Sequence, residues 1–146
     1  MILAHTIIGV NAGDYFGHFW YILIGSIIPD IDHIFVLAKN KIYTPSKIID
    51  TMRFEKNYNL EFKTKYVHSV LGAIAFSLPV ALIDFNGAIY FFFSYIFHLI
   101  IDWLDYDEKQ YLFPLKTKFK GFLPIFSKQE IFITIILIVL MIYSFS

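Results

Sequence analysis

Three long apolar runs dominate this chain, and each is close to the length needed to cross a lipid bilayer. The runs cover residues 67–84, 86–104 and 130–146, which are 18, 19 and 17 residues long. At about 1.5 Å per residue, helices of this length cover roughly 25–28 Å, enough for a thin bilayer. With 58% hydrophobic residues and a mean hydropathy of +0.62, the chain of 146 residues is too apolar for a soluble domain. We therefore predict an all-α membrane protein with a single domain over residues 1–146.

The amino-terminal third is apolar but divided into shorter pieces. Residues 2–12 and 16–28 are 11 and 13 residues long, and polar residues separate them. We interpret them as two short helices that form a hairpin, which gives a compact bundle of about five helices. The alternative is one helix over residues 16–37 that continues through Pro29. It would place ionisable side chains near mid-membrane, at about 2.5–3.5 kcal/mol per charge.

The positions of the charges predict orientation. All 12 basic residues lie in two loops, residues 39–65 and 109–128, and the other connections carry none. By the positive-inside rule both loops face the cytoplasm, which predicts a multi-pass protein of the cell membrane. The formal net charge is zero, which argues against nucleic-acid binding by phosphate neutralisation. Without cysteine, any metal must be held by nitrogen and oxygen.

An up-and-down path through these helices brings the ionisable residues to one end of the bundle. The candidate metal ligands are His5, Asp30, Asp32, His33, His68, His98 and Asp102. His98 and Asp102 are one helical turn apart and share a face. Pro29 is expected to interrupt its helix, so that the residues after it can turn inward.

Seven candidate ligands exceed the three or so that a catalytic zinc takes from protein. Either some of them orient the imidazoles, or two ions about 3.5–4 Å apart share a bridging carboxylate. Mixed imidazole and carboxylate ligands suit a divalent metal, with zinc as the best match and manganese or iron as alternatives.

At these residues the sequence resembles the YdjM-like family of predicted membrane-bound metal-dependent hydrolases. The resemblance runs from His5-Thr6 through Gly-Ser-Ile-Ile-Pro-Asp-Ile-Asp-His at residues 25–33 and His68-Ser69 to His-Leu-Ile-Ile-Asp at residues 98–102. The family is distantly similar to zinc-dependent phospholipase C and P1 nuclease, whose metal sites use His and Asp. The resemblance therefore implies hydrolysis of a phosphoester.

One segment departs from the family pattern. Family members usually carry His-Arg-Gly-x-Thr-His-Ser before the third helix, whereas residues 63–69 read Lys-Thr-Lys-Tyr-Val-His-Ser. The ligand His68 is retained, but the arginine that could hold an anionic substrate is absent. Either Lys63 or Lys65 replaces it, as a point charge without the bidentate fork of arginine, or the chemistry has been lost.

The sequence thus predicts a membrane-embedded hydrolase in which metal activates water for attack on a phosphoester, with a lipid-linked phosphoester as one candidate substrate. Membrane lipids are the expected partners, because the basic loops attract anionic headgroups. Asp32 is expected to be a bridging ligand or the general base, and Ser69 to contact substrate or to cap its helix. Asp105, Asp107 and Glu108 are interpreted as a solvated loop. The alternatives are a non-catalytic metal-binding protein and a scaffolding membrane protein.

Overall fold

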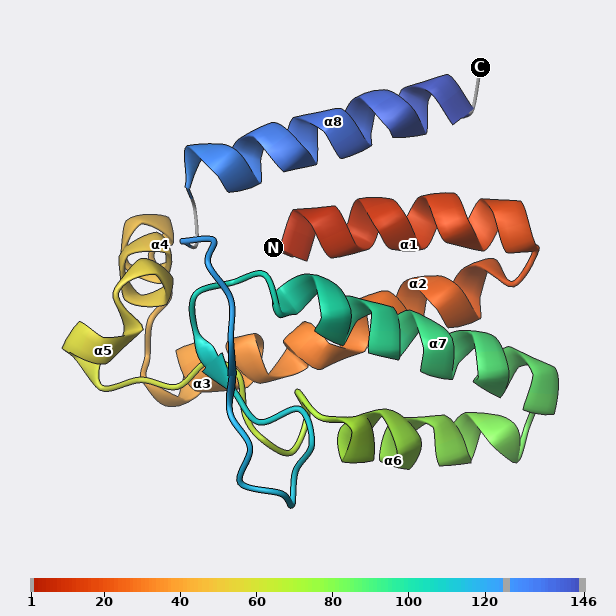
Figure 1. The fold of residues 1–146 in the computed structure, drawn as a ribbon, viewed down its shortest axis with the longest axis horizontal. Coiled ribbons are helices and arrows are strands. Elements are labelled where there is room, and N and C mark those ends of the chain that lie inside the picture. The colour runs from red at the N-terminus through yellow and green to blue at the C-terminus, as the bar shows by residue number, and fades with distance from the viewer. Residues whose placement is uncertain (1, 125–126, 145–146) are drawn as a thin grey trace.

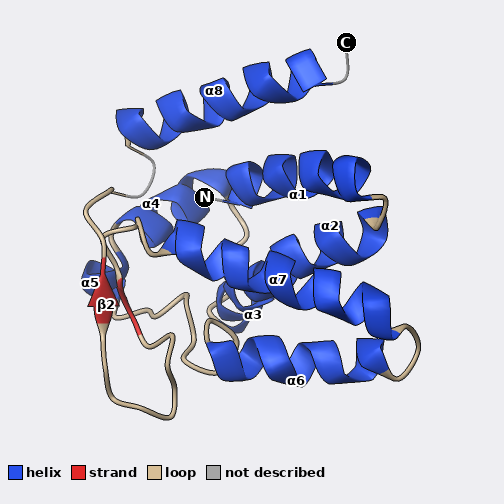
Figure 2. Cartoon of the chain, turned by 45° about the vertical axis from the view of Figure 1, so that its right-hand side comes forward, coloured by secondary structure: helices blue, strands red, loops and turns tan. Residues whose placement is uncertain are grey.

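Helices account for most of residues 2–124 and 127–144, which the computed structural model describes. The helical elements are α1 (Ile2–Phe16), α2 (Phe19–Ile27), the 3₁₀ turn η1 (Ile28–Asp30), α3 (Ile31–Lys39), α4 (Pro45–Arg53), α5 (Glu55–Tyr58), α6 (Val70–Ala81), α7 (Phe85–Asp102) and α8 (Lys128–Ser144). An antiparallel ribbon pairs β1 (Glu108–Lys109) with β2 (Phe119–Lys120). The predicted all-α class is confirmed (Figures 1 and 2).

The helices α1, α2, α6, α7 and α8 run roughly along the long axis of the molecule, whereas α3, α4, α5 and the ribbon gather at one end (Figure 1). The start of α1, the start of α6 and the end of α7 lie at this same end. The up-and-down path expected from the sequence is therefore present.

Local polar residues set the ends of these helices. Gly17 has a φ of +72°, which only glycine adopts readily, and it closes α1 before the chain turns back into α2. Ser69 Oγ accepts a hydrogen bond from Gly72 N at 3.1 Å and caps α6. Ser127 Oγ accepts from Glu130 N at 3.2 Å at the start of α8. α1 and α2 thus pair as a hairpin, as predicted, although the second helical run continues past residue 28. Ser69 serves as a helix cap.

Three boundaries differ from the prediction. The first helix extends to Phe16 instead of residue 12, through the polar residues that were expected to end it. The second helix does not end at residue 28, because α2, η1 and α3 follow one another as a helical run over Phe19–Lys39, as in the alternative of one helix through Pro29. Pro29 permits this, since it stands in the first turn of η1, where no N–H is needed. The helix predicted over residues 67–84 is shorter, because Ser69 caps it at one end and it stops at Ala81. Residues 145–146 of the last predicted helix lie outside the described part of the chain.

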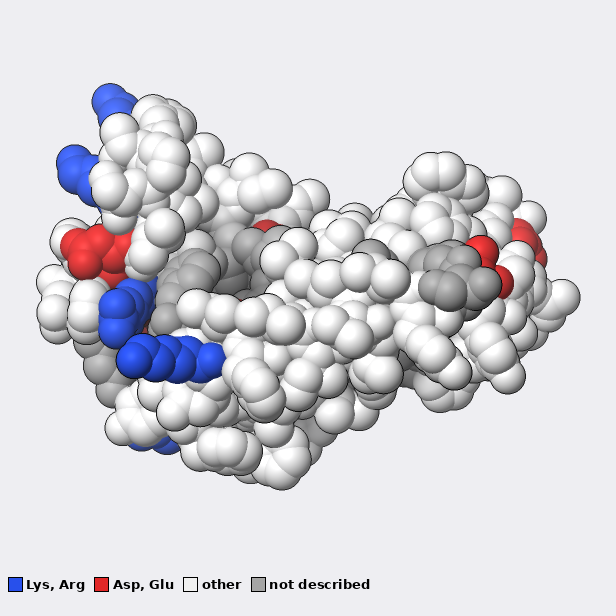
Figure 3. Space-filling view, turned by 90° about the horizontal axis from the view of Figure 1, so that it is seen from above, with Lys and Arg blue, Asp and Glu red and all other residues white. Residues whose placement is uncertain are grey.

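Within the described residues, two helical runs are long and apolar enough to cross a membrane. They are Phe19–Lys39 with 21 residues and Phe85–Asp102 with 18. The outer surface is also apolar: Leu82 and Ile83 are 90% and 86% exposed. On the face drawn in Figure 3, Lys and Arg gather at one end of the molecule, and most of the remaining surface is uncharged. This distribution is typical of a protein that lies in a bilayer.

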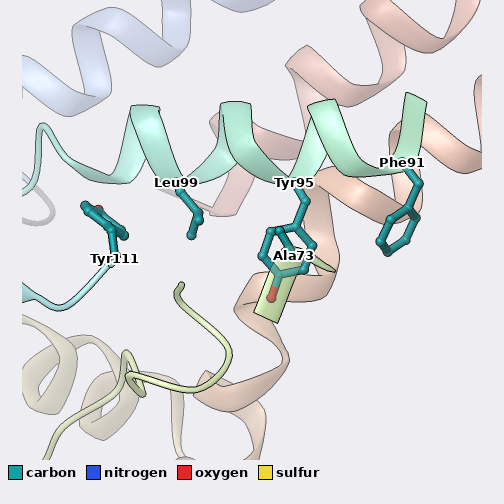
Figure 4. Close-up of a cluster of buried hydrophobic side chains, with 5 residues drawn as sticks. All are labelled: Ala73, Phe91, Tyr95, Leu99 and Tyr111. Atoms are coloured by element: carbon teal, nitrogen blue, oxygen red, sulfur yellow. The ribbon is translucent and has the colours of Figure 1, made fainter. Parts of the chain in front are cut away.

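The core is built around α7. Tyr95, Phe91 and Leu99 project from α7 toward Ala73 of α6 and toward Tyr111, which follows the ribbon strand β1 (Figure 4). The fully buried Tyr95 donates a hydrogen bond from Oη to the backbone oxygen of Val67 at 2.6 Å. That bond ties α7 to the segment that carries His68.

Close contact between α2 and α7 depends on a glycine. A Cβ atom at Gly25 would lie 2.5 Å from the backbone oxygen of Phe91. Small residues allow helix backbones to approach closely in membranes, where burial of apolar surface supplies little driving force between helices. Gly25 therefore lets α2 and α7 pack closely beside the site.

Candidate metal centre

Four segments bring the seven predicted ligands together in the interior. α1 carries His5, η1 and α3 carry Asp30, Asp32 and His33, the segment before α6 carries His68, and α7 carries His98 and Asp102. Each of the seven residues is at most 6% exposed. Such dense burial of ionisable groups is costly unless they pair with one another or with a metal.

Asp102 lies in the middle of the cluster. Its Oδ1 accepts a hydrogen bond from His5 Nε2 at 2.9 Å. Its Oδ2 lies 3.3 Å from His68 Nε2 and 3.7 Å from His98 Nε2. The predicted pairing of His98 and Asp102 on one helix face is therefore present, and residues from two other segments join it.

Asp32 has a different surrounding. Its Oδ1 accepts from His33 Nδ1 at 2.9 Å, and its Oδ2 accepts from His68 Nδ1 at 2.9 Å and from Thr64 N at 2.8 Å. Both carboxylate oxygens are therefore occupied by donors. These contacts favour a role in orienting two imidazoles over a role as a bridging ligand.

His98 is oriented by the backbone of α2. Its Nδ1 lies 2.7 Å from the carbonyl oxygen of Ser26, so Nδ1 must carry the proton and donate it. In a continuous α-helix that carbonyl would accept from Asp30 N, but the 3₁₀ turn shortens the pattern to i, i−3, as in the bond from Ile31 N to Ile28 O. The turn at Pro29 thus leaves the carbonyl available to His98.

The four imidazoles share one arrangement. Each directs one ring nitrogen to an acceptor, namely Asp102 for His5, Asp32 for His33 and His68, and Ser26 for His98. The other nitrogen is then left with a lone pair. Metal-binding histidines are usually held in this way, with the second nitrogen donating to a carboxylate or carbonyl.

The cluster also contains buried polar atoms that lack a hydrogen bond. Within residues 2–124 and 127–144 these include His5 Nδ1, Asp30 Oδ2, His68 Nε2, His98 Nε2 and Asp102 Oδ2. Three groups have ligand atoms within 4.8 Å of one another: His5 with Asp30 and His98, Asp30 with His33 and His68, and His68 with His98 and Asp102. The donor set therefore fits a divalent metal, and Asp32 is in none of the three groups.

Two lysines and an aspartate join the cluster from outside the predicted set. Lys63 Nζ lies 2.6 Å from Asp105 Oδ2 and 3.0 Å from Asp102 Oδ2. Burial alone would lower the pKa of Lys63, but these two carboxylates outweigh it and hold the pKa well above its ordinary value. Lys109 Nζ donates to the backbone oxygens of Asp102 and Asp105, the latter at 3.0 Å, at the end of α7. Burial and the neighbouring Lys63 lower the pKa of Lys109 to about 8.

The interpretation of Asp105, Asp107 and Glu108 as a solvated loop is wrong for Asp105, which is 1% exposed. The ribbon folds back over it, and Gly121 N donates to its backbone oxygen at 3.1 Å. Glu108 is exposed and pairs with Lys118 at 2.9 Å. Spacing alone could not reveal this, because Asp105 acquires its partner from 42 residues away.

A cavity of about 620 Å³ reaches the cluster from between α1, α2 and α7. His5 and His98 are among its lining residues, and their rings stack at 3.7 Å. His18 lies elsewhere, stacked on Tyr90 at 4.1 Å.

Comparison with known proteins gives one family. The model of a family described as YdjM inner membrane protein matches residues 2–146. No curated protein and no solved structure matches the chain.

Proposed function

The chain belongs to the YdjM inner membrane protein family, and we propose that it is a membrane-embedded, metal-dependent hydrolase of phosphoesters. The observation that carries this proposal is the shared orientation of the four imidazoles, each with one nitrogen tied to an acceptor and the other free for a metal. The basic loops lie at the same end as the cluster, which supports our proposal that the site faces the cytoplasm in a multi-pass protein.

Ligands and positioning residues can be assigned within the cluster. The candidate ligands are His5, Asp30, His33, His68, His98 and Asp102, the members of the three groups with converging ligand atoms, and one ion would take about three of them. Asp32 holds His33 and His68 in place and does not bind the ion. Nitrogen and oxygen ligands suit zinc, and also manganese or iron.

The charges favour one ion over two. The described part of the site holds four buried carboxylates, those of Asp30, Asp32, Asp102 and Asp105, and two buried lysines, Lys63 and Lys109. Neutral imidazoles leave two negative charges, as many as one divalent cation carries. Lys63 Nζ already lies 3.0 Å from Asp102 Oδ2, which weakens the attraction of this carboxylate for a further cation.

The proposed reaction also needs a protein group that accepts the proton of the attacking water. A divalent ion supplies the Lewis acidity that activates water and polarises the phosphoester. The water oxygen forms the new bond to phosphorus while the bond to the leaving oxygen breaks. Asp30 Oδ2 is buried and makes no hydrogen bond to any described residue, so it is the acceptor that we assign for the proton of the attacking water.

The test uses purified protein in detergent, with metal content measured by elemental analysis and hydrolysis followed on bis(p-nitrophenyl) phosphate. We expect about one divalent ion per chain, chelator-sensitive hydrolysis, and loss of both in His98→Ala. His18→Ala is the matched control, because it removes a histidine outside the cluster. Full metal content without hydrolysis of this phosphodiester would refute the proposed hydrolase activity.

One observation favours a second candidate. Every assigned ligand is at most 6% exposed, and closed shells are typical of structural metal sites. A non-catalytic metal-binding protein would then retain the ion and lose its fold on chelation. A scaffolding role without metal would show neither metal nor chelator sensitivity.

A further inference from the structure

The cavity beside the cluster, called the channel below, runs along one face of α1. Its lining residues on α1 are His5, Ile8, Gly9, Ala12 and Phe16, a spacing of three and four residues that keeps them on one helix face. From His5 to Phe16 this face extends about 16 Å at 1.5 Å per residue. The volume of about 620 Å³ is ordinary for a small-molecule site.

The two parts of the channel differ in chemistry. At the cluster, His5 Nδ1 and His98 Nε2 belong to side chains that are 1% exposed, and neither atom makes a hydrogen bond within the described chain. Away from the cluster the walls are mainly apolar, with Ala12, Phe93 and Phe97 among them. The complementary ligand is therefore an amphiphile with its polar group at the histidines.

Ser26 and Ser94 also line the channel, but their hydroxyl groups do not make its walls polar. Ser26 Oγ donates to the backbone oxygen of Leu23 at 2.8 Å, and Ser94 Oγ donates to the backbone oxygen of Ile22 at 2.6 Å. Both donors are satisfied by the helices themselves. The channel thus offers few polar groups to a ligand outside its histidine end.

The length of the channel favours a hydrocarbon chain as its apolar occupant. Its face on α1 extends about 16 Å, which is close to the depth of one leaflet, half of a core about 30 Å thick. A single acyl chain can therefore run from the histidines along the apolar walls.

The channel is also open to the surrounding bilayer. α1 packs mainly against α2 and α8 and makes little contact with α7. Along the gap, Phe93 and Phe97 of α7 are 65% and 49% exposed. A chain can therefore enter sideways, between α1 and α7, without leaving the hydrocarbon.

We propose that this channel binds one hydrocarbon chain of a lipid phosphoester, whose phosphate group then lies at the His/Asp cluster. The inference rests on the proposed hydrolase for its headgroup chemistry. The channel itself is testable without any turnover.

The first experiment compares two diesters with the same leaving group, methyl p-nitrophenyl phosphate and hexadecyl p-nitrophenyl phosphate, with protein in phosphatidylcholine nanodiscs. Ala12→Phe places a ring in the channel, and Ala81→Phe is the same substitution at a half-buried position of α6 outside it. We expect Ala12→Phe to lower kcat/KM for the hexadecyl ester at least about tenfold and to spare the methyl ester. Equal loss on both esters, or no loss on either, would overturn the channel.

The second experiment needs no hydrolysis. Phosphatidic acid with a diazirine at the end of one acyl chain is irradiated in phosphatidylcholine vesicles that contain the protein. We expect labels on the α1 and α7 peptides around Ala12 and Phe93, reduced in Ala12→Phe and unchanged in Ala81→Phe. Labels spread evenly over the lipid-facing sides of α6 and α8, and insensitive to Ala12→Phe, would refute the proposal. If neither ester is hydrolysed but the channel is labelled, the hydrolase fails and the lipid site stands.

Discussion

Replacing Asp32 by asparagine separates orientation of the imidazoles from direct binding of the ion. In the wild type, the Asp32 carboxylate accepts three hydrogen bonds, from His33 Nδ1, His68 Nδ1 and Thr64 N. Asparagine can keep its oxygen on the side of His68 and Thr64, but its NH₂ group then faces the N–H of His33. One hydrogen bond to a charged acceptor is lost, about 1.5–3 kcal/mol.

That loss can be compared with known effects on metal sites. Removal of a group that orients a metal-binding histidine weakens metal affinity about 10–100-fold, or about 1.4–2.7 kcal/mol. The two ranges overlap, so we expect Asp32→Asn to weaken zinc binding by this factor. The dissociation constant would be measured in detergent by competition with a chelating indicator.

Two control variants distinguish a positioning role of Asp32 from direct binding of the ion. Asp50→Asn changes an exposed aspartate that accepts a hydrogen bond from Tyr58 outside the cluster, and it should leave affinity within about twofold. His98→Ala removes a ligand and should weaken binding more than Asp32→Asn does. The reasoning is wrong if Asp32→Asn binds zinc as tightly as the wild type. It is also wrong if Asp32→Asn loses as much affinity as His98→Ala, since Asp32 would then be a ligand.

Three further substitutions test the surroundings of the site by thermal unfolding in detergent. Gly25→Ala should destabilise the fold by about 1–3 kcal/mol, because its Cβ would lie 2.5 Å from the backbone oxygen of Phe91; unchanged stability would contradict the close packing of α2 and α7. Tyr95→Phe should cost about 1 kcal/mol, since it removes the hydrogen bond of 2.6 Å from Tyr95 Oη to the Val67 carbonyl, which then accepts from Ser69 N alone among the described donors. Burial and repulsion from a neighbouring aspartate raise the pKa of Glu55 to about 8 in the folded protein, from an ordinary value of 4.5. The folded state therefore binds this proton more tightly than the unfolded chain does. The resulting stability is fully present below pH 4.5 and is lost as pH rises through 8. Glu55→Gln stays neutral and should flatten the pH dependence of Tm between pH 5 and 9; parallel curves would refute it.

Helix ends explain why much of the site could be predicted from the sequence. In an up-and-down bundle, the start of one helix and the end of the next lie on the same side. His5, His68 and the end of α7 are therefore expected at the same end of the bundle. The spacing of His98 and Asp102 needed only helical periodicity. The distance of a residue from its helix end depends on nearby residues only, so it can be predicted from the sequence.

The continuation of the second helix past Pro29 corresponds to the alternative that the sequence argument did not prefer, because the cost of burial was counted for each charge in isolation. In the structure, Asp32 contacts two imidazoles and a backbone N–H, so the helical run carries a compensated group into the interior. Such compensation depends on His68, 36 residues away. Asp105 was misplaced for the same reason.

The position of Lys63 shows how this chain differs from the family motif, which has an arginine in this segment. The sequence offered Lys63 and Lys65 as replacements for an arginine that grips substrate, yet the side chain of Lys63 is 6% exposed and pairs with Asp102 and Asp105. It cannot turn to a substrate without taking its charge away from two buried carboxylates, which is strongly unfavourable. Lys65 lies over the rings of Tyr66 and Phe113, at 5.4 and 5.5 Å, outside the cluster. Neither lysine is placed to hold an anion at the histidines, so in the proposed reaction the bound ion itself must attract the phosphate.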